Sequence, residues 1–233
     1  MSNQIYKDKF YTHLDIKKYH TNYQQRVENI NWVSRHGFYP FIHFQMDCSK
    51  YTNDSEGNKF IKEKNRDIFY AAHIDRFIYE YYGNRLNNRY NNYMKSSGIS
   101  RVSTAYRNCT PGKCNIDFAK EVFEYIIKCE SAYIFVGDFS KFFDNLDHRY
   151  LKEKIKSVIG KKSLDVADYA IYKNITKFTY VEADDIESDK GMFRRDMRNF
   201  DKYFETNDFH MFKKKCLHKN QKDYQIPQGS SIS

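Results

Sequence analysis

The chain has 233 residues, with 39 Lys and Arg against 30 Asp and Glu, and a formal net charge of +9. This length suits one sizeable domain or two small ones with a real buried core. No apolar run approaches the roughly 20 residues of a membrane span and no signal peptide opens the chain, so we expect a cytoplasmic protein without membrane contact.

The five cysteines are irregularly spaced and odd in number, which argues against a disulfide framework and favours free thiols. Cys109 and Cys114 could form half of a zinc site, but zinc sites usually need a second closely spaced pair. Lys and Arg recur along the whole chain without a dense tail. This distribution suits a surface that follows a polyanion, and a merely solvated basic surface is the alternative.

In chain order, residues 1–30 show no strong alternation and predict a weakly helical arm. The aromatic-rich residues 38–51, the polar cluster 52–58 and the alternating residues 59–72 together predict a β-hairpin. Side chains two apart share a face of a strand, so Lys62, Lys64 and Arg66 should form a row of cations. Such a row is either a solvated edge or a clamp for phosphate, and the pattern alone leaves both open.

Two helices should follow the hairpin. Apolar residues at Ile74, Phe77, Ile78, Tyr81 and Tyr82 have the spacing of an amphipathic helix over 73–94. A second helix is expected over about 116–129, with an inward face made of Phe118, Val122, Phe123, Ile126 and Ile127.

The apolar run 133–139 predicts a central strand that ends on the carboxylate of Asp138. A helix should begin after Leu146, with Asp147 as its N-cap and with Leu151 and Ile155 on its buried face. Residues 167–181 predict a further helix, whereas the polar stretch 182–223 gives no clear pattern.

At this point the sequence resembles a known family. GDFSKFFDNLDHRYL, residues 137–151, looks like the first catalytic motif of reverse transcriptases, in which a strand ends in a metal-binding Asp. IPQGSSIS, residues 226–233, resembles that family's following Pro-Gln-Gly turn. Residues 65–82 are similar to the fingers segment of the family, and residues 100–119 to a segment that group II intron and retron-like enzymes place before the catalytic strand.

The resemblance implies roles for individual residues. Asp138 and the backbone carbonyl of Phe139 would bind Mg²⁺, and Phe143 would reject a ribose 2′-hydroxyl by steric clash. Lys64 and Arg66, with Lys62 as an alternative, would hold the incoming triphosphate, and Gln228 and Gly229 would pack against nucleotide and template. Three further residues, Asp144, Asp147 and His148, are interpreted as turn, cap and surface residues, and Arg107 as a family arginine of undefined role.

The implied fold is an α/β right-hand polymerase fragment, with fingers and an incomplete palm and without a thumb. We expect an N-terminal arm over 1–30, fingers over 31–130, and palm over 131–233 with a fingers-like insertion at about 155–222. The second carboxylate of the family lies in a Tyr-x-Asp-Asp hairpin after the Pro-Gln-Gly turn, and Asp184 and Asp185 are poor substitutes because they precede that turn. We therefore expect this sequence to be the N-terminal part of a longer enzyme, inactive alone; a natural remnant is the alternative.

The implied activity is RNA-directed DNA synthesis by two-metal nucleotidyl transfer, with an RNA template, a DNA or RNA primer and deoxynucleoside triphosphates as partners. Because no maturase, integrase or nuclease segment is visible, the chain looks most like bacterial antiphage-defence and abortive-infection enzymes, or like retron enzymes, for which a non-coding RNA is a further partner. Two alternatives stay open: a non-catalytic module that binds nucleic acid or a protein partner, and a template-independent nucleotidyltransferase.

Overall fold

The structure is a computed structural model that describes residues 8–105, 107 and 112–230. These residues form a mixed α/β fold with a four-stranded sheet, so the α/β fold class is confirmed at this level. The 3-10 helix, α-helices and strands are, in chain order, η1 His20–Asn22, α1 Gln24–Glu28, α2 Ile30–Arg35, β1 Phe41–Asn53, β2 Lys59–Tyr70, α3 His73–Ser96, α4 Asn115–Ile127, α5 Phe142–Asn145, α6 His148–Ile159, α7 Val166–Thr176, β3 Thr179–Glu182, α8 Ala183–Lys190, α9 Thr206–Cys216 and β4 His218–Lys219.

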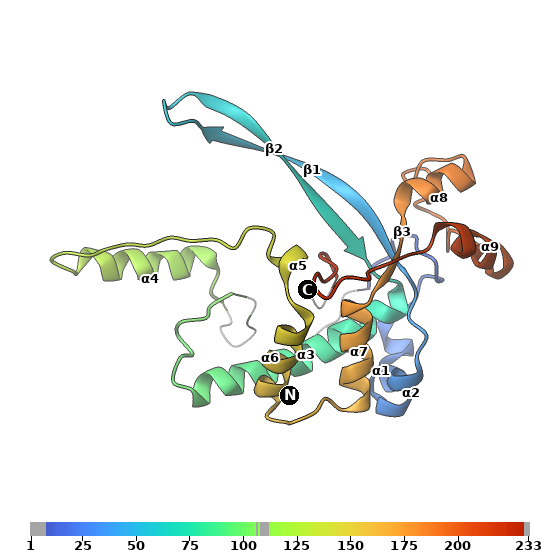
Figure 1. The fold of residues 1–233 in the computed structure, drawn as a ribbon, viewed down its shortest axis with the longest axis horizontal. Coiled ribbons are helices and arrows are strands. Elements are labelled where there is room, and N and C mark those ends of the chain that lie inside the picture. The colour runs from blue at the N-terminus through green and yellow to red at the C-terminus, as the bar shows by residue number, and fades with distance from the viewer. Residues whose placement is uncertain (1–7, 106, 108–111, 231–233) are drawn as a thin grey trace.

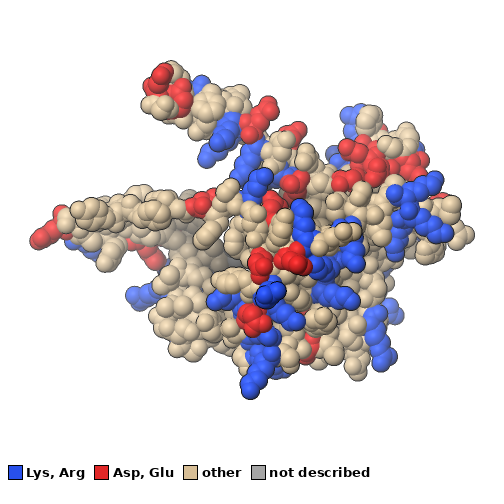
Figure 2. Space-filling model, in the orientation of Figure 1, with Lys and Arg blue, Asp and Glu red and all other residues tan. Residues whose placement is uncertain are grey.

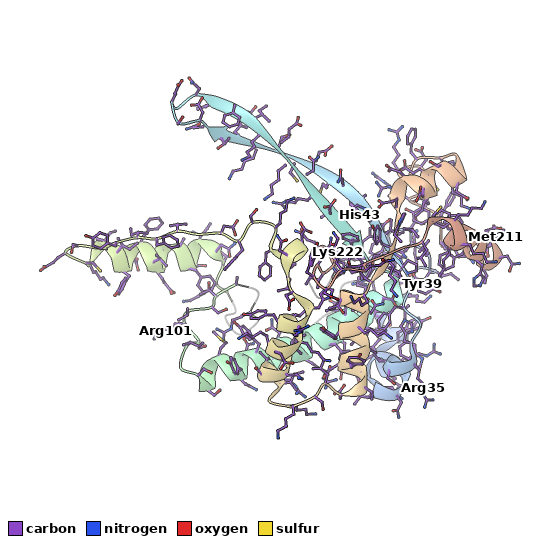
Figure 3. The ribbon with its side chains drawn as sticks, in the orientation of Figure 1. Arg35, Tyr39, His43, Arg101, Met211 and Lys222 are labelled. Carbon is purple, nitrogen blue, oxygen red and sulfur yellow. The ribbon has the colours of Figure 1, made fainter. Side chains whose placement is uncertain are left out.

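The predicted hairpin is confirmed, and it projects far from the body of the molecule (Figure 1). Strands β1 and β2 pair antiparallel from Ile42 opposite Tyr70 to Asn53 opposite Lys59. The sheet order is β2-β1-β3-β4, with β3 parallel to β1 and β4 antiparallel to β3. Only the base of the hairpin is covered, and side chains of its outer half extend into open space on both faces (Figure 3).

Two hydrophobic clusters hold the base of the sheet, one on each face. Because side chains alternate along a strand, Phe41 and Ile42 belong to different clusters. Phe41 and Phe69 pack with α3 and α7, whereas Ile42 packs with α8 and the segment before α9. The sheet base is therefore covered on both sides, which fixes the direction in which the hairpin projects.

The helix predictions are partly confirmed. Helix α3 buries Ile74, Phe77, Ile78 and Tyr82 as expected, with Tyr81 partly buried. Helix α6 begins as predicted, because the Asp147 carboxylate accepts a hydrogen bond from the Tyr150 amide at 2.6 Å. The predicted helix 167–181 is α7 only as far as Thr176, and its last residues form β3. The unassigned stretch 182–223 contains α8, α9 and β4.

Two predictions for residues 116–139 are wrong in this structure. Helix α4 forms, but none of its residues is buried, so the predicted inward face has nothing to pack against. Residues 133–139 form no strand and are exposed. The physical reason is that a strand needs a neighbour for its backbone hydrogen bonds, and no described strand lies beside this segment. Helix α4 and the segment after it project from the body, largely without charged atoms in the view shown (Figure 2).

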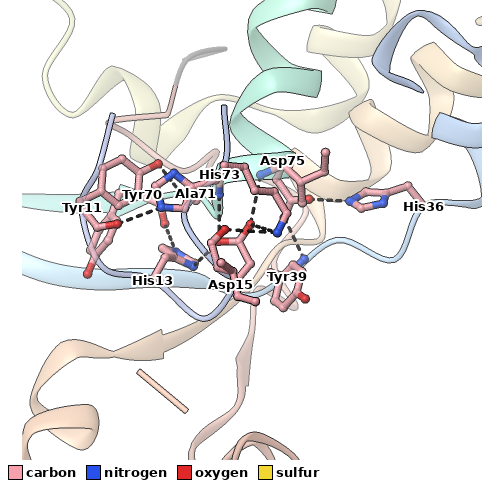
Figure 4. A network of polar contacts seen from close by, with 12 residues as sticks. Tyr11, His13, Asp15, His36, Tyr39, Tyr70, Ala71, His73 and Asp75 are labelled. Atoms are coloured by element: carbon pink, nitrogen blue, oxygen red, sulfur yellow. Dashed lines mark hydrogen bonds and ion pairs between the residues drawn. The ribbon is translucent and has the colours of Figure 1, made fainter. Parts of the chain in front are cut away.

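The N-terminal arm is only partly helical, and residues 8–19 have no helix at all. This stretch nevertheless lies in the core, with Leu14 in the cluster on the Ile42 face and His13 fully buried. The carboxylate of Asp15 accepts hydrogen bonds from the amides of His73 and Ile74 at 3.0 and 3.2 Å (Figure 4). Ala72 cannot cap α3 itself, so Asp15, 57 residues earlier, supplies the cap.

The arm and the start of α3 share a buried polar network (Figure 4). The ring Nε2 of His13 donates to the Tyr70 carbonyl at 3.1 Å, and that of His73 donates to the Tyr11 carbonyl at 2.9 Å. Burial lowers the pKa of His13 to about 4 and also lowers that of His73. Burial raises the pKa of Asp75 to about 6, although its hydrogen bond from His36 at 2.6 Å opposes this shift.

The described residues contain no helix that combines the length and the apolar character needed to cross a membrane. Cys48, Cys114, Cys129 and Cys216 are free thiols, as expected. Cys109, the other half of the hypothetical zinc pair, lies outside the described residues, as do Ser231–Ser233 at the end of the Pro-Gln-Gly motif.

Replacing Asp15 with Ala should destabilise the fold, because two buried amides at the start of α3 lose their acceptor. We expect the free energy of unfolding to fall by about 2 kcal/mol. Chemical denaturation followed by circular dichroism measures this change. Asp184→Ala is the matched control: it removes an exposed carboxylate from the first turn of α8 and should cost no more than about 0.5 kcal/mol. Equal losses in the two variants would contradict the capping role.

The buried His13 should make stability depend on pH. The unfolded chain takes up this proton near pH 6.5 and the folded chain only near pH 4, so between these values the unfolded state holds more protons. Above pH 6.5 the titration of His13 does not affect the free energy of unfolding. As the pH falls from 6.5 towards 4, that free energy decreases by on the order of 3 kcal/mol.

Denaturation curves of the wild type and of His13→Gln at pH 7, 5.5 and 4.5 isolate this contribution from that of Asp75, whose raised pKa acts in the opposite sense. His13→Gln should lose less stability than the wild type on acidification, whereas the exposed His210→Gln should behave as the wild type does. Parallel pH profiles for all three proteins would show that His13 is not the titrating group.

Candidate functional site

The two faces of the hairpin carry opposite charge. Lys62, Lys64 and Arg66 lie on one face of β2, and Lys50 of β1 stands directly opposite Lys62. The other face carries three acidic residues of the two strands, Asp47, Glu63 and Asp67. We call the first the cationic face. Two lysines directly opposite each other repel, so a bound anion would reduce the electrostatic repulsion on this face.

The cations of this face are free to bind a ligand. Lys62, Lys64 and Arg66 are exposed, and within the described part of the chain none of them makes an ion pair. The same holds for Lys50. Most other ion pairs, such as Lys156 with Glu153, lie within one helix or between close neighbours and leave this face untouched.

The Pro-Gln-Gly turn docks on the outer edge of β2. The Gln228 carbonyl accepts a hydrogen bond from the Phe69 amide at 2.8 Å, on the edge of β2 that does not face β1. Gly229 has φ +102°, and a Cβ built on it would lie 3.1 Å from the Ile68 side chain and 3.3 Å from the Phe69 carbonyl oxygen. Only glycine fits this approach without displacement. Ile68 shares the cationic face with Arg66, two residues and about 7 Å away along the strand.

The segment before this turn is bound to the segment after Asp138. The Ile226 amide donates to the Phe143 carbonyl at 3.0 Å, and the His148 amide donates to the Asp223 carbonyl at 2.9 Å. The Nε2 of His148 donates to the Gln225 carbonyl at 2.7 Å. His148 is 5% exposed, so its interpretation as a surface residue is wrong. It was missed because its partner lies 77 residues further along the chain.

Phe143 is therefore placed beside the Pro-Gln-Gly turn. It lies in the short helix α5, half buried, with its ring centroid 5.5 Å from that of Phe142. Asp144, in the same short helix, is half buried in its first turn. Figure 1 shows the C-terminal end of the described chain next to α5 and the base of the hairpin.

Asp138 and Phe139 precede α5 in the exposed irregular segment. Within the described residues, Asp138 makes no hydrogen bond or ion pair, and Phe139 is 81% exposed. The structure thus brings Phe143, Gln228, Gly229 and the base of the cationic face together, and it leaves Asp138 outside this contact. Asp184 and Asp185 lie in the first turn of α8 and not in a hairpin, consistent with their rejection as catalytic carboxylates.

No group of three or more His, Cys, Asp and Glu side chains arranged to hold a metal ion occurs among the described residues. Asp138 and the Phe139 carbonyl supply oxygen ligands of the kind that Mg²⁺ prefers, but two ligands do not complete a site for two ions. The metal role of these residues stays a prediction.

Two arginine findings lie outside the predicted site. The guanidinium of Arg107 donates to the side chain of Asn91 at 2.8 Å and to the carbonyl of Ser103 at 2.9 Å, so this residue ties the loop after α3 back onto that helix. Sequence reasoning missed Arg194, Arg195 and Arg198, which line a cavity beside the cationic face. Three arginines in five residues were the available signal.

Comparisons with known proteins assign no family to this chain. No model of a protein family matches it, and no curated protein matches it either.

Replacing Gly229 with Ala should loosen the contact between the turn and β2, because the added Cβ meets the Ile68 side chain and the Phe69 backbone. We expect about 2 kcal/mol of lost stability and faster hydrogen exchange of the Phe69 amide, whose acceptor is the Gln228 carbonyl. Nuclear magnetic resonance measures that exchange.

Gly98→Ala is the matched control. Gly98 also has a positive φ, +71°, but a Cβ there meets nothing within 4 Å, so this variant carries only the backbone strain. It should leave the exchange of the Phe69 amide unchanged. If Gly229→Ala also leaves that amide unchanged, the turn does not depend on this close approach.

Proposed function

We propose that this protein is an RNA-directed DNA polymerase that works by two-metal nucleotidyl transfer, with a role in bacterial antiviral defence. One observation carries the proposal. Three stretches far apart in sequence, each resembling a different motif of reverse transcriptases, meet at the base of the hairpin through the hydrogen bonds Phe69–Gln228 and Phe143–Ile226. Chance matches to short motifs have no reason to converge in space.

The cationic face supports a role in binding the triphosphate of a nucleotide. Lys64 and Arg66 are exposed and unpaired within the described residues, and a guanidinium suits bidentate contact with phosphate oxygens. The turn with Gln228 and Gly229 lies against Ile68 and Phe69 at the inner end of this face, so a nucleotide that extends inward from Arg66 would meet the turn. A nucleotide would thus lie along β2, with its phosphates towards Arg66.

Phe143 supplies the proposed selection against ribonucleotides. Its backbone carbonyl accepts a hydrogen bond from the Ile226 amide, two residues before Gln228, and its ring lies edge-on to that of Phe142. A ring at this position would reject a 2′-hydroxyl by clash, which is discrimination by a built-in repulsive contact.

The proposal gives Asp138 and the Phe139 carbonyl the task of binding Mg²⁺, which would stabilise the negative charge that develops during phosphoryl transfer. The described residues do not complete a two-metal site by themselves. The template is RNA, the primer DNA or RNA, and the substrates deoxynucleoside triphosphates. The assignment to bacterial defence rests on the resemblance alone.

Arg66→Ala should weaken the binding of a deoxynucleoside triphosphate by about ten- to a hundredfold, because one charge-assisted contact to phosphate is lost. Isothermal titration calorimetry with this chain and dTTP measures the change. Lys59→Ala is the control: Lys59 lies on the same strand, exposed, and its side chain points to the opposite face. Equal affinities of Arg66→Ala and the wild type would remove the triphosphate from the cationic face.

Asp138→Asn should abolish nucleotide incorporation and leave RNA binding unchanged, since the substitution removes one carboxylate from an exposed segment that packs on nothing. Primer extension on an RNA template, with the natural protein that contains this sequence, measures nucleotide incorporation. A filter-binding assay measures RNA binding. Asp144→Asn, in the neighbouring helix α5, is the control and should retain synthesis. Full synthesis by Asp138→Asn would reject the catalytic assignment.

Binding of nucleic acid without catalysis is a second candidate. One contrast favours it: the cationic face is fully formed, whereas the segment with Asp138 makes no strand. This candidate predicts affinity for RNA that falls with salt, and neither metal dependence nor incorporation.

A further inference from the structure

A cavity of about 830 Å³ lies between the base of the hairpin, the N-terminal arm and the segment after α8. Phe44, Ile68 and Tyr70 of the hairpin line one side, all from the cationic face. The arm contributes residues 9–12, and the segment after α8 contributes most of the remaining wall. We call this space the hairpin cavity. Its volume is in the range of pockets that bind small molecules or single nucleotides of a longer chain.

The walls of the hairpin cavity are fixed to each other. The hydroxyl of Thr12 donates to the Met197 carbonyl at 2.8 Å, and the Tyr203 amide donates to the His13 carbonyl at 2.9 Å. The arm is also tied to the hairpin through the His13 ring and the Tyr70 carbonyl. The cavity is thus a preformed feature, held by hydrogen bonds between segments that lie far apart in the sequence.

The hairpin cavity carries unneutralised positive charge. Arg194 is committed to the protein itself, because it pairs with Glu187 at 3.1 Å and lies over the Phe44 ring, 4.7 Å from its centroid. Lys9 and Arg198, by contrast, are exposed and make no ion pair with any described residue. The ion pair of Arg195 with its neighbour Asp196, at 3.6 Å, is exposed. Three cations therefore remain available to an anionic ligand.

Two large aromatic rings lie exposed beside these cations. Phe10 is 50% exposed and Phe193 is 61% exposed, although both line the cavity. The Arg195 guanidinium lies 5.0 Å from the centroid of the Phe193 ring. Exposing such rings costs free energy in a free protein, and the combination of open rings with free cations is typical of surfaces on which nucleic-acid bases stack.

We propose that the hairpin cavity binds single-stranded nucleic acid. Bases stack on Phe10 and Phe193, and the phosphates lie against Lys9, Arg195 and Arg198. A single strand is required because paired bases do not offer their faces to a protein ring. Because Ile68 lines the cavity and shares its face with Arg66, a strand bound here continues along the cationic face. This inference requires no catalytic activity and stands if the polymerase assignment fails.

The test is fluorescence anisotropy of a labelled twelve-nucleotide oligo(U) with this chain at several salt concentrations. Phe193→Ala should weaken binding about tenfold, since stacking on one ring contributes about 1 to 3 kcal/mol. Arg198→Ala should weaken binding and reduce the slope of log affinity against log salt by about 0.7, the value for one phosphate contact on a single strand. Both residues are exposed, so thermal unfolding should stay unchanged.

Tyr125→Ala and Arg35→Ala are the matched controls. Tyr125 is exposed on α4, which buries nothing, and Arg35 is exposed at the end of α2. Neither lines the hairpin cavity, so neither should change affinity or salt slope. Equal affinity of Phe193→Ala and the wild type, equal binding of a blunt duplex of the same length, or equal competition by an acidic peptide would each overturn the proposal. The titration of Arg66→Ala with dTTP tests the triphosphate site and not the hairpin cavity. A failure of the cavity proposal can therefore be distinguished from a failure of the polymerase proposal.

Discussion

Residues 223–229 connect the segment with α5 and α6 to strand β2 through a small number of backbone hydrogen bonds. On one side, the carbonyl of Phe143 and the amide of His148 are satisfied by Ile226 and Asp223; on the other, the free edge of β2 is satisfied by Gln228. An unpaired buried amide costs about as much as a lost hydrogen bond, so these contacts fix the turn in one position. The relation between α5, the turn and the cationic face depends on them.

The hairpin shows how one physical rule organises both candidate sites. A strand alternates its side chains between two faces, so a single register divides β1 and β2 into a cationic and an acidic surface. The same cationic face continues inward as Phe44, Ile68 and Tyr70, where it lines the hairpin cavity. The proposed phosphate binding lies on the outer, charged part of this face, and the inner part forms one wall of the cavity proposed to bind single-stranded nucleic acid.

Local patterns predicted much of this arrangement. The period-2 pattern of 59–72, the apolar spacing of 73–94 and the Asp147 cap are interactions within a few residues, and each is confirmed. The predictions that failed concern partners. An apolar stretch such as 133–139 has strand character, but no described strand pairs with it, and the apolar side of α4 likewise has nothing to cover it.

The contacts that sequence reasoning missed join residues far apart in the chain. Asp15 caps α3 across 58 residues to His73, and the His148 ring meets the Gln225 carbonyl across 77. No periodicity encodes such pairs, because each residue alone looks like an ordinary polar residue of an arm or a helix start. The part of the candidate site that rests on motifs was predicted from the sequence: Lys64, Arg66, Phe143, Gln228 and Gly229. The arginines around the hairpin cavity belong to none of these motifs, and only the fold shows that they line one cavity.

We propose that the cationic face and the Pro-Gln-Gly turn together form one nucleotide site. Photo-cross-linking with an azido-deoxynucleoside triphosphate, followed by mass spectrometry of the labelled peptides, tests it most directly. We expect label on peptides that contain Arg66–Tyr70 and Gln228, and loss of this label in the presence of excess unmodified nucleotide. Label confined to peptides outside both segments, or label that excess nucleotide does not displace, would contradict it.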